Sequence, residues 1–170
     1  MTAATDLLLD GFGRVHERVR AVVDGADEAM LTARLDADAN SIGWLVWHLL
    51  RVQDDHVAGV AGTEQVWTSA GWYERFGLPF DAAEHGYGHS TGDVAQVRGV
   101  SAADFAGYAD DVHAATTRYV RTLTDDDLSR VVDENWDPPV TLAVRLVSVI
   151  DDDLEHAGQA AFVRGVVERR

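Results

Sequence analysis

Apolar residues recur every three or four positions in four stretches of the chain, with polar and charged residues between them. This spacing places the apolar residues on one face of an α-helix. It predicts amphipathic helices over residues 6–24, 41–62, 101–124 and 141–167. Their apolar stripes are Leu8, Phe12, Val15, Val19 and Val22; Ile42, Leu45, Leu49, Val52 and Val60; Phe105, Tyr108, Val112, Tyr119 and Leu123; and Leu142, Val149, Ala160, Val163 and Val167.

The residues around these stretches act as helix start and stop signals. Ser41 is a good N-cap residue, Ser101 with Asp104 resembles a capping box, and glycines follow the second helix. The connector over 62–93 is rich in glycine and turn formers, with one short helix expected over 69–76. Residues 128–132 are too short a stretch to count as a strand. The pattern predicts an all-α four-helix bundle that forms a single domain over residues 1–170.

Composition limits the function more than the fold. The chain has 170 residues, 46% of them hydrophobic, which suits one domain with a good core. A net charge of −15 disfavours binding to nucleic acid or to an anionic membrane. There are no cysteines, so disulfides, thiolate metal sites and a cysteine nucleophile are excluded. With neither a signal-like amino terminus nor a long apolar run, the protein is expected in the cytoplasm.

Two titratable residues lie on the apolar stripe of the last helix. Asp152 and His156 are four residues apart and therefore share a helical face, and His48 lies on the inward stripe of the second helix. Two histidines and one carboxylate suit a divalent metal with open coordination positions. An Asp152–His156 ion pair without metal would also satisfy both groups. The neighbours Asp151 and Asp153 are expected on the exposed flanks.

Aromatic and histidine residues cluster in and after the second helix. Trp47, Trp67 and Trp72 either line a pocket that binds a cofactor or pack one end of the bundle. His85 and His89, in the glycine-rich connector, could cover a site from above or simply be solvated. The connector is long enough to suggest a functional role.

Four segments carry a resemblance to a known family: NSIGWLVWHLLRVQDDHV, GWYERFGLPFD, GYGHS with DVAQVR, and IDDDLEHAGQAAFVRG. Together they resemble the DinB-like superfamily, in particular the branch of mycothiol-dependent maleylpyruvate isomerase and the DUF664 proteins. The resemblance implies an up-up-down-down four-helix bundle, often a homodimer, with a divalent metal near one end. By position it implies the ligands His48, Asp152 and His156, the same three residues that the helical pattern selects.

The resemblance also implies a chemistry. Its better-known members are transferases or isomerases that use mycothiol, bacillithiol or glutathione. The donor set of two histidines and one carboxylate suits zinc, nickel, iron or manganese, of which zinc is expected here. In this chain Asp55 or His56 would accept a proton, and Gln159 would orient a ligand at a position where relatives often carry histidine. Two alternatives stay open: a metal-dependent hydrolase, and a bundle that binds a metal or small ligand without catalysis.

Overall fold

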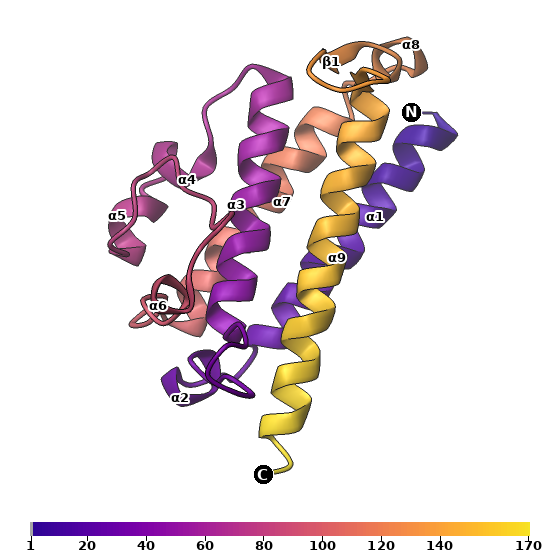
Figure 1. Ribbon diagram of the computed structural model, residues 1–170. Coiled ribbons are helices and arrows are strands. Elements are labelled where there is room, and N and C mark those ends of the chain that lie inside the picture. Colours follow the sequence, from indigo (N-terminus) through magenta and orange to yellow (C-terminus); the bar gives the residue numbers. More distant parts are fainter. Residues whose placement is uncertain (1) are drawn as a thin grey trace.

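Four long helices form the body of the protein in a computed structural model that describes residues 2–170 (Figure 1). They are α1 (Ala3–Val23), α3 (Ile42–Ala61), α7 (Ala102–Val120) and α9 (Leu142–Val167). In each case the preceding residue is a serine or threonine whose side chain accepts a hydrogen bond from the first turn. The predicted all-α four-helix bundle is confirmed.

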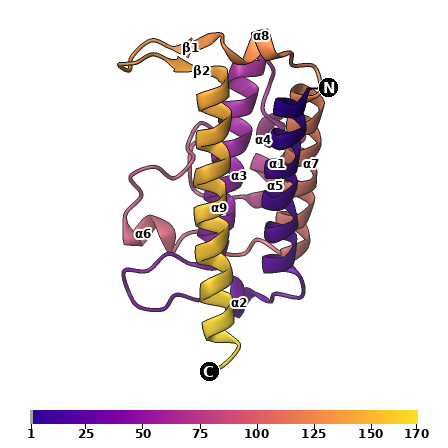
Figure 2. The ribbon, with the colours of Figure 1, turned by 90° about the vertical axis from the view of Figure 1, so that its right-hand side faces the viewer.

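The order of helix directions differs from the expected up-up-down-down arrangement. The first turns of α1 and α9 and the last turns of α3 and α7 share one apolar cluster, which includes Leu8, Val57, Val120 and Leu142. Helices α1 and α9 therefore run parallel to each other and antiparallel to α3 and α7, as Figures 1 and 2 show. The topology is up-down-down-up, because the connector after α3 returns along the bundle and lets α7 start beside the start of α3.

This long connector carries three short helices, α4 (Val66–Ser69), α5 (Trp72–Phe76) and α6 (Thr91–Val94), beside α3 and α7 (Figure 1). The helix expected over 69–76 is divided at Gly71, which has a φ of 74° and separates α4 from α5. Another short helix, α2 (Glu28–Leu31), lies between α1 and α3. The connector packs its aromatic side chains inward, so it is part of the core.

A small hairpin joins α7 to α9 at the end of the bundle where α1 and α9 begin. After α8 (Asp125–Leu128), strand β1 (Val131–Asp133) pairs antiparallel with β2 (Val140–Thr141), with Val131 opposite Thr141. The prediction that this region lacks strands was wrong. Val131 and Val132 on one side and Val140 and Thr141 on the other have high β-propensity and flank a segment with two prolines, and their pairing makes even these short strands stable.

Tryptophans fill the space between the connector and the bundle. Trp67 and Trp72 pack against Phe76 and Tyr108, with ring centroids 5.1 to 6.2 Å apart. Such aromatic packing contributes large buried apolar area and fixes the connector on the helices. Among residues 2–170, no helix combines the length and the apolar character that crossing a membrane requires.

Candidate metal centre and its pocket

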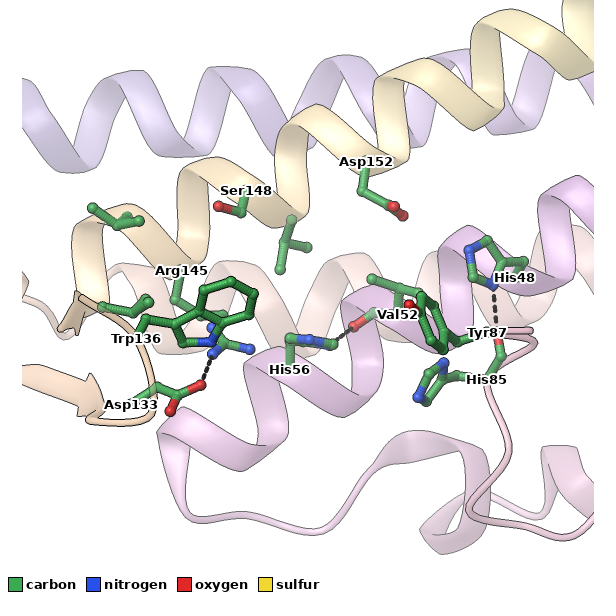
Figure 3. A pocket seen from close by; sticks show the side chains of 13 residues that line it. His48, Val52, His56, His85, Tyr87, Asp133, Trp136, Arg145, Ser148 and Asp152 are labelled. Carbon is green, nitrogen blue, oxygen red and sulfur yellow. Dashed lines mark hydrogen bonds and ion pairs between the residues drawn. The ribbon is translucent and has the colours of Figure 1, made fainter. Parts of the chain in front are cut away.

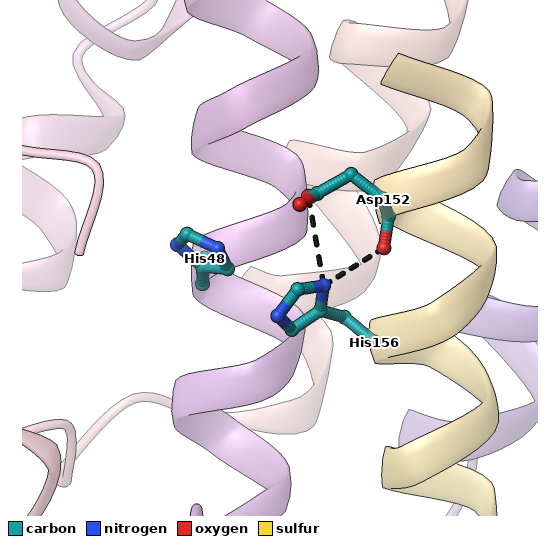
Figure 4. A group of neighbouring side chains, drawn as sticks. All are labelled: His48, Asp152 and His156. Carbon is teal, nitrogen blue, oxygen red and sulfur yellow. Dashed lines mark hydrogen bonds and ion pairs between the residues drawn. The ribbon is translucent and has the colours of Figure 1, made fainter. Parts of the chain in front are cut away.

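The structure brings His48, Asp152 and His156 together across the α3–α9 interface (Figure 4). Each offers one ligand atom, and these atoms all lie within 4.8 Å of one another. His48 is buried in the middle of α3, whereas the two residues of α9 are half-buried and one helical turn apart. The helical pattern therefore predicted correctly that these three side chains meet.

Backbone carbonyls orient both imidazoles. The Nδ1 atom of His48 is hydrogen bonded to the carbonyl oxygen of His85, and Nδ1 of His156 lies 2.8 Å from the carbonyl oxygen of Asp152. Because a carbonyl only accepts, each Nδ1 carries a proton, which leaves Nε2 as the atom of each ring that can bind a metal. Burial lowers the pKa of His48, which favours the neutral, ligating form. Such hydrogen bonds are typical of the surroundings of metal-binding histidines.

The surroundings of the Asp152 carboxylate also fit a metal ligand. Its Oδ2 atom is buried and has no hydrogen-bond partner among residues 2–170. The nearest ring nitrogen is Nδ1 of His156, at 3.5 Å, and that nitrogen already donates to a carbonyl. A buried carboxylate oxygen without a partner is costly unless a cation or water satisfies it. The donor set of two imidazoles and one carboxylate suits zinc, nickel, iron or manganese.

A segment of the connector over 81–86 holds His48 in place. Gly86 has a φ of 96°, and a Cβ atom there would lie 2.9 Å from Nδ1 of His48 and 3.0 Å from the ring of Trp47. Only glycine allows both this backbone conformation and this close approach. The segment can therefore bring the His85 carbonyl against His48 because residue 86 has no side chain.

Arg51 anchors the same segment, although the sequence pattern did not single it out. Its guanidinium is fully buried, and it donates to the carbonyl oxygens of Ala82 at 3.1 Å and Glu84 at 3.2 Å and to Oε1 of Gln65 at 2.8 Å. It also lies over the ring of Trp67. A buried cation with two acceptors on this segment and a third at the start of the connector is a strong positional restraint. The sequence signal that was missed is an arginine on an otherwise apolar helix face.

Asp54 fixes the start of the connector in a similar way. Its carboxylate accepts from the backbone N–H groups of Val66 and Trp67 and from the hydroxyl of Tyr108, at 2.8 to 3.0 Å. Burial raises the pKa of Asp54, and these hydrogen bonds oppose that rise. Arg51 and Asp54 of α3 thus both dock the connector.

A pocket of about 600 Å³ opens beside the triad (Figure 3). One wall is the α3 series His48, Val52 and His56, and the opposite wall comes from α9 and includes Arg145, Ser148 and Asp152. The volume lies within the range of small-molecule sites. Further lining residues are His85 and Tyr87 of the connector and Asp133, Trp136 and Val140 of the hairpin region.

The three residues expected to take part in proton transfer or orientation have different surroundings. His56 lines the pocket, and its Nδ1 donates to the carbonyl oxygen of Val52 at 3.0 Å, so Nε2 is its lone-pair atom. Burial, followed by the positive charge of Arg145, lowers its pKa. Asp55 accepts from Gln65 at 2.7 Å and lies outside this pocket. Gln159 is exposed on α9 and is not part of the pocket lining.

The three tryptophans expected to bind a cofactor are buried. Trp47, Trp67 and Trp72 are 1%, 2% and 7% exposed, and none of them lines the pocket beside the triad. They pack in the core between the connector and the bundle. Of the two connector histidines, His85 lines the pocket, while His89 accepts from Trp44 and pairs with Glu84.

Asp153 is buried, although it was expected to be exposed. Asp151 is exposed as predicted, but Asp153 is fully buried, and neither of its carboxylate oxygens has a hydrogen-bond partner within residues 2–170. The helix is rotated so that Asp153 continues the stripe of Leu146 and Val149 and Asp152 lies beside it. Burial, with the nearby charge of Asp152, raises the pKa of Asp153 well above its usual value.

Comparisons with known proteins agree with this architecture. The family profile of the DinB superfamily matches residues 12–160. A solved structure described as a conserved protein from Enterococcus faecalis is 30% identical and superimposes with a TM-score of 0.91. That match covers 100% of this chain and 99% of the other. No curated protein matches the chain. The chain belongs to the DinB superfamily, whose members bind divalent metal ions.

Proposed function

We propose that the protein is a divalent-metal-dependent enzyme that uses a low-molecular-weight thiol of the mycothiol type, as an S-transferase or isomerase acting on a small electrophile. The observation that carries the proposal is the His48–Asp152–His156 cluster, which opens on a pocket of about 600 Å³. This volume accommodates a small substrate together with the reactive part of a thiol. Because the chain has no cysteine, the thiol must come from outside.

The residues in and beside the pocket would have different roles in this reaction. His48, Asp152 and His156 would hold the metal, which when bound supplies the positive charge that lowers the pKa of a nearby thiol. His56 presents a neutral Nε2 to the same pocket, eight residues along α3 from His48, and would take up the proton of the thiol after its passage through water in the pocket. The sulfur then forms a bond to the electrophilic carbon, and the displaced group leaves with its electron pair. The pocket would hold the sulfur and the electrophilic carbon beside one another.

The first test measures metal binding. Protein purified without chelator or histidine tag is expected to contain about one equivalent of zinc or another divalent metal, by inductively coupled plasma mass spectrometry. His48→Ala is expected to lose it. His16→Ala is the matched control, because His16 pairs with Asp110 on the surface of α1 and α7. Full metal content in His48→Ala would remove the assignment of the ligands.

The second test measures thiol dependence. Zinc-loaded protein is mixed with 1-chloro-2,4-dinitrobenzene and mycothiol, bacillithiol or glutathione in turn, and formation of the thioether is followed. The expected rate depends on both metal and thiol and disappears in His48→Ala. Metal binding without a thiol-dependent rate on this or other small electrophiles would contradict the transferase assignment.

His56 favours one second candidate, a metal-dependent hydrolase of small esters or amides. A neutral imidazole in the same pocket as the triad would serve equally well to take a proton from water. The two candidates are separated by adding thiol to a metal-dependent reaction. Ester cleavage that does not change with thiol would support the hydrolase.

A further inference from the structure

The pocket has two chemically different ends. Along α3, His48 and His56 are eight residues apart, and along α9, Asp152 and Arg145 are seven apart. At 1.5 Å per residue, the two ends are separated by about 10 to 12 Å along the helix axes. The two helices run antiparallel, so His48 and Asp152 of the triad line one end of the pocket and His56 with Arg145 lines the other (Figure 3).

Arg145 is only partly engaged by the protein. Its side chain is 22% exposed, and Nη2 donates to Oδ2 of Asp133 at 2.9 Å. Within residues 2–170 this is its only protein hydrogen bond, although a guanidinium has five N–H donors. Asp133 also accepts from the backbone and side chain of Asn135 at 3.0 and 2.9 Å. Asp133 therefore holds the guanidinium against the pocket and leaves most of its donors for a ligand.

The end of the pocket at Arg145 carries a positive charge, unlike most of this acidic protein. The chain carries a net charge of −15, yet Arg145 is the only arginine among the residues that line the pocket. Its charged partners there are Asp133 and Asp152, so a divalent cation held by the triad would make the lining net positive. The positive charge of Arg145 also reaches His56, whose pKa it lowers. A ligand anion beside Arg145 would face His56 in its neutral form.

Apart from Ser148 and His85, the rest of the lining consists of valines and two aromatic side chains. Val52, Val140, Val144 and Val149 form the walls, and two aromatic side chains of the lining, Tyr87 and Trp136, are 89% and 66% exposed. Exposed aromatic rings beside a pocket offer apolar area to a bound molecule at low conformational cost. The walls thus suit an uncharged body between the two ends.

From these observations we infer that the pocket selects a small amphipathic anion: an apolar body whose carboxylate is bound by Arg145 while its other end lies at the triad. This inference names the substrate class for the proposed function and rests on the same pocket. A carboxylate and a guanidinium form a bidentate, charge-assisted pair, whereas a neutral amide cannot replace that pairing. The difference between an acid and its amide is therefore the measurable signature.

The test compares 4-phenylbutyrate with 4-phenylbutyramide by isothermal titration calorimetry, using both zinc-loaded and chelator-treated protein. The acid is expected to bind about tenfold or more tightly than the amide, as a charge-assisted hydrogen bond predicts. Arg145→Gln is expected to abolish that preference and Arg145→Lys to retain much of it. Arg118→Gln, which removes an exposed arginine on α7 that lines a different recess, is expected to leave the preference intact.

Each outcome decides the inference. The inference would be overturned if acid and amide bind equally, if neither binds, or if Arg145→Gln keeps the preference for the acid. If Arg145→Gln keeps that preference only when loaded with zinc, the carboxylate ligates the metal instead. If Arg145→Gln does not fold, the acid-to-amide ratio of the unaltered protein and its fall with added salt remain the test. An acid preference in chelator-treated protein that needs Arg145 would stand even if the metal assignment failed.

Discussion

The close approach of Gly86 to His48 offers a sharp test of how the connector prepares the metal ligand. In Gly86→Ala, the new Cβ would lie 2.9 Å from Nδ1 of His48, 3.0 Å from the ring of Trp47 and 3.1 Å from that of Trp44. The connector must move away, and His48 then loses the His85 carbonyl that fixes its proton on Nδ1. Loss of such a partner typically weakens metal binding 10- to 100-fold, which corresponds to about 1.4 to 2.8 kcal/mol.

Gly88→Ala is the matched control for this substitution. Gly88 also has a positive φ, 78°, but a Cβ there would meet nothing within 4 Å. Both variants therefore carry the backbone cost of a left-handed alanine, about 1 to 2 kcal/mol, and only Gly86→Ala adds the collision with His48. The difference between them isolates the contribution of the close approach.

Zinc affinity is measured by competition with a chromophoric chelator, and the visible spectrum of the cobalt-substituted protein reports the ligand geometry. The expected result is a 10- to 100-fold loss of affinity in Gly86→Ala and a change within about twofold in Gly88→Ala. Equal affinities in the two variants, with equal cobalt spectra, would refute the view that the connector orients His48.

Two further predictions concern titratable groups. Because the positive charge of Arg145 contributes to the lowered pKa of His56, Arg145→Gln is expected to raise that pKa toward 6.5, as NMR titration of the ring would show; an unchanged or lower value would contradict the proximity. Asp153→Asn is expected to increase the free energy of unfolding at pH 7 by about 1 kcal/mol or more, because a buried carboxyl no longer has to take up a proton on folding. The folded pKa of Asp153 is raised, so this gain should shrink as the pH falls toward 3.8, where the unfolded carboxyl is also protonated. Denaturant melts across this pH range would show it, and a gain that grows at low pH would refute it.

The bundle itself could be predicted because its signal is local. Leu8, Phe12, Val15 and Val19 repeat at helical spacing and are buried, and the serine before α3 caps that helix as expected. Helix direction could not be predicted this way, because an amphipathic stripe buries equally well in either direction. The contacts that place the start of α1 beside the end of α3 are long-range, and they decided the topology.

The same distinction between local signals and long-range contacts applies to the site. Spacing alone placed Asp152 and His156 on one face of α9, whereas the register of α9 against α1 and α3 decided that Asp153 is fully buried. In a run of three aspartates, the local sequence does not indicate which of them faces the core. The hairpin was missed for a related reason, since strand pairing depends on a partner segment.

The sequence by itself determined the helices, their inward faces and the three residues that meet at the centre, because helical periodicity needs only neighbouring positions. Tertiary structure alone decided the proton positions on His48 and His156, the role of Gly86 and the anchoring by Arg51. It also decided that His56 and Arg145 face one pocket while Asp55 and Gln159 lie outside it. These features depend on the distances between atoms far apart in the chain, and packing fixes those distances only once the connector has folded onto the bundle.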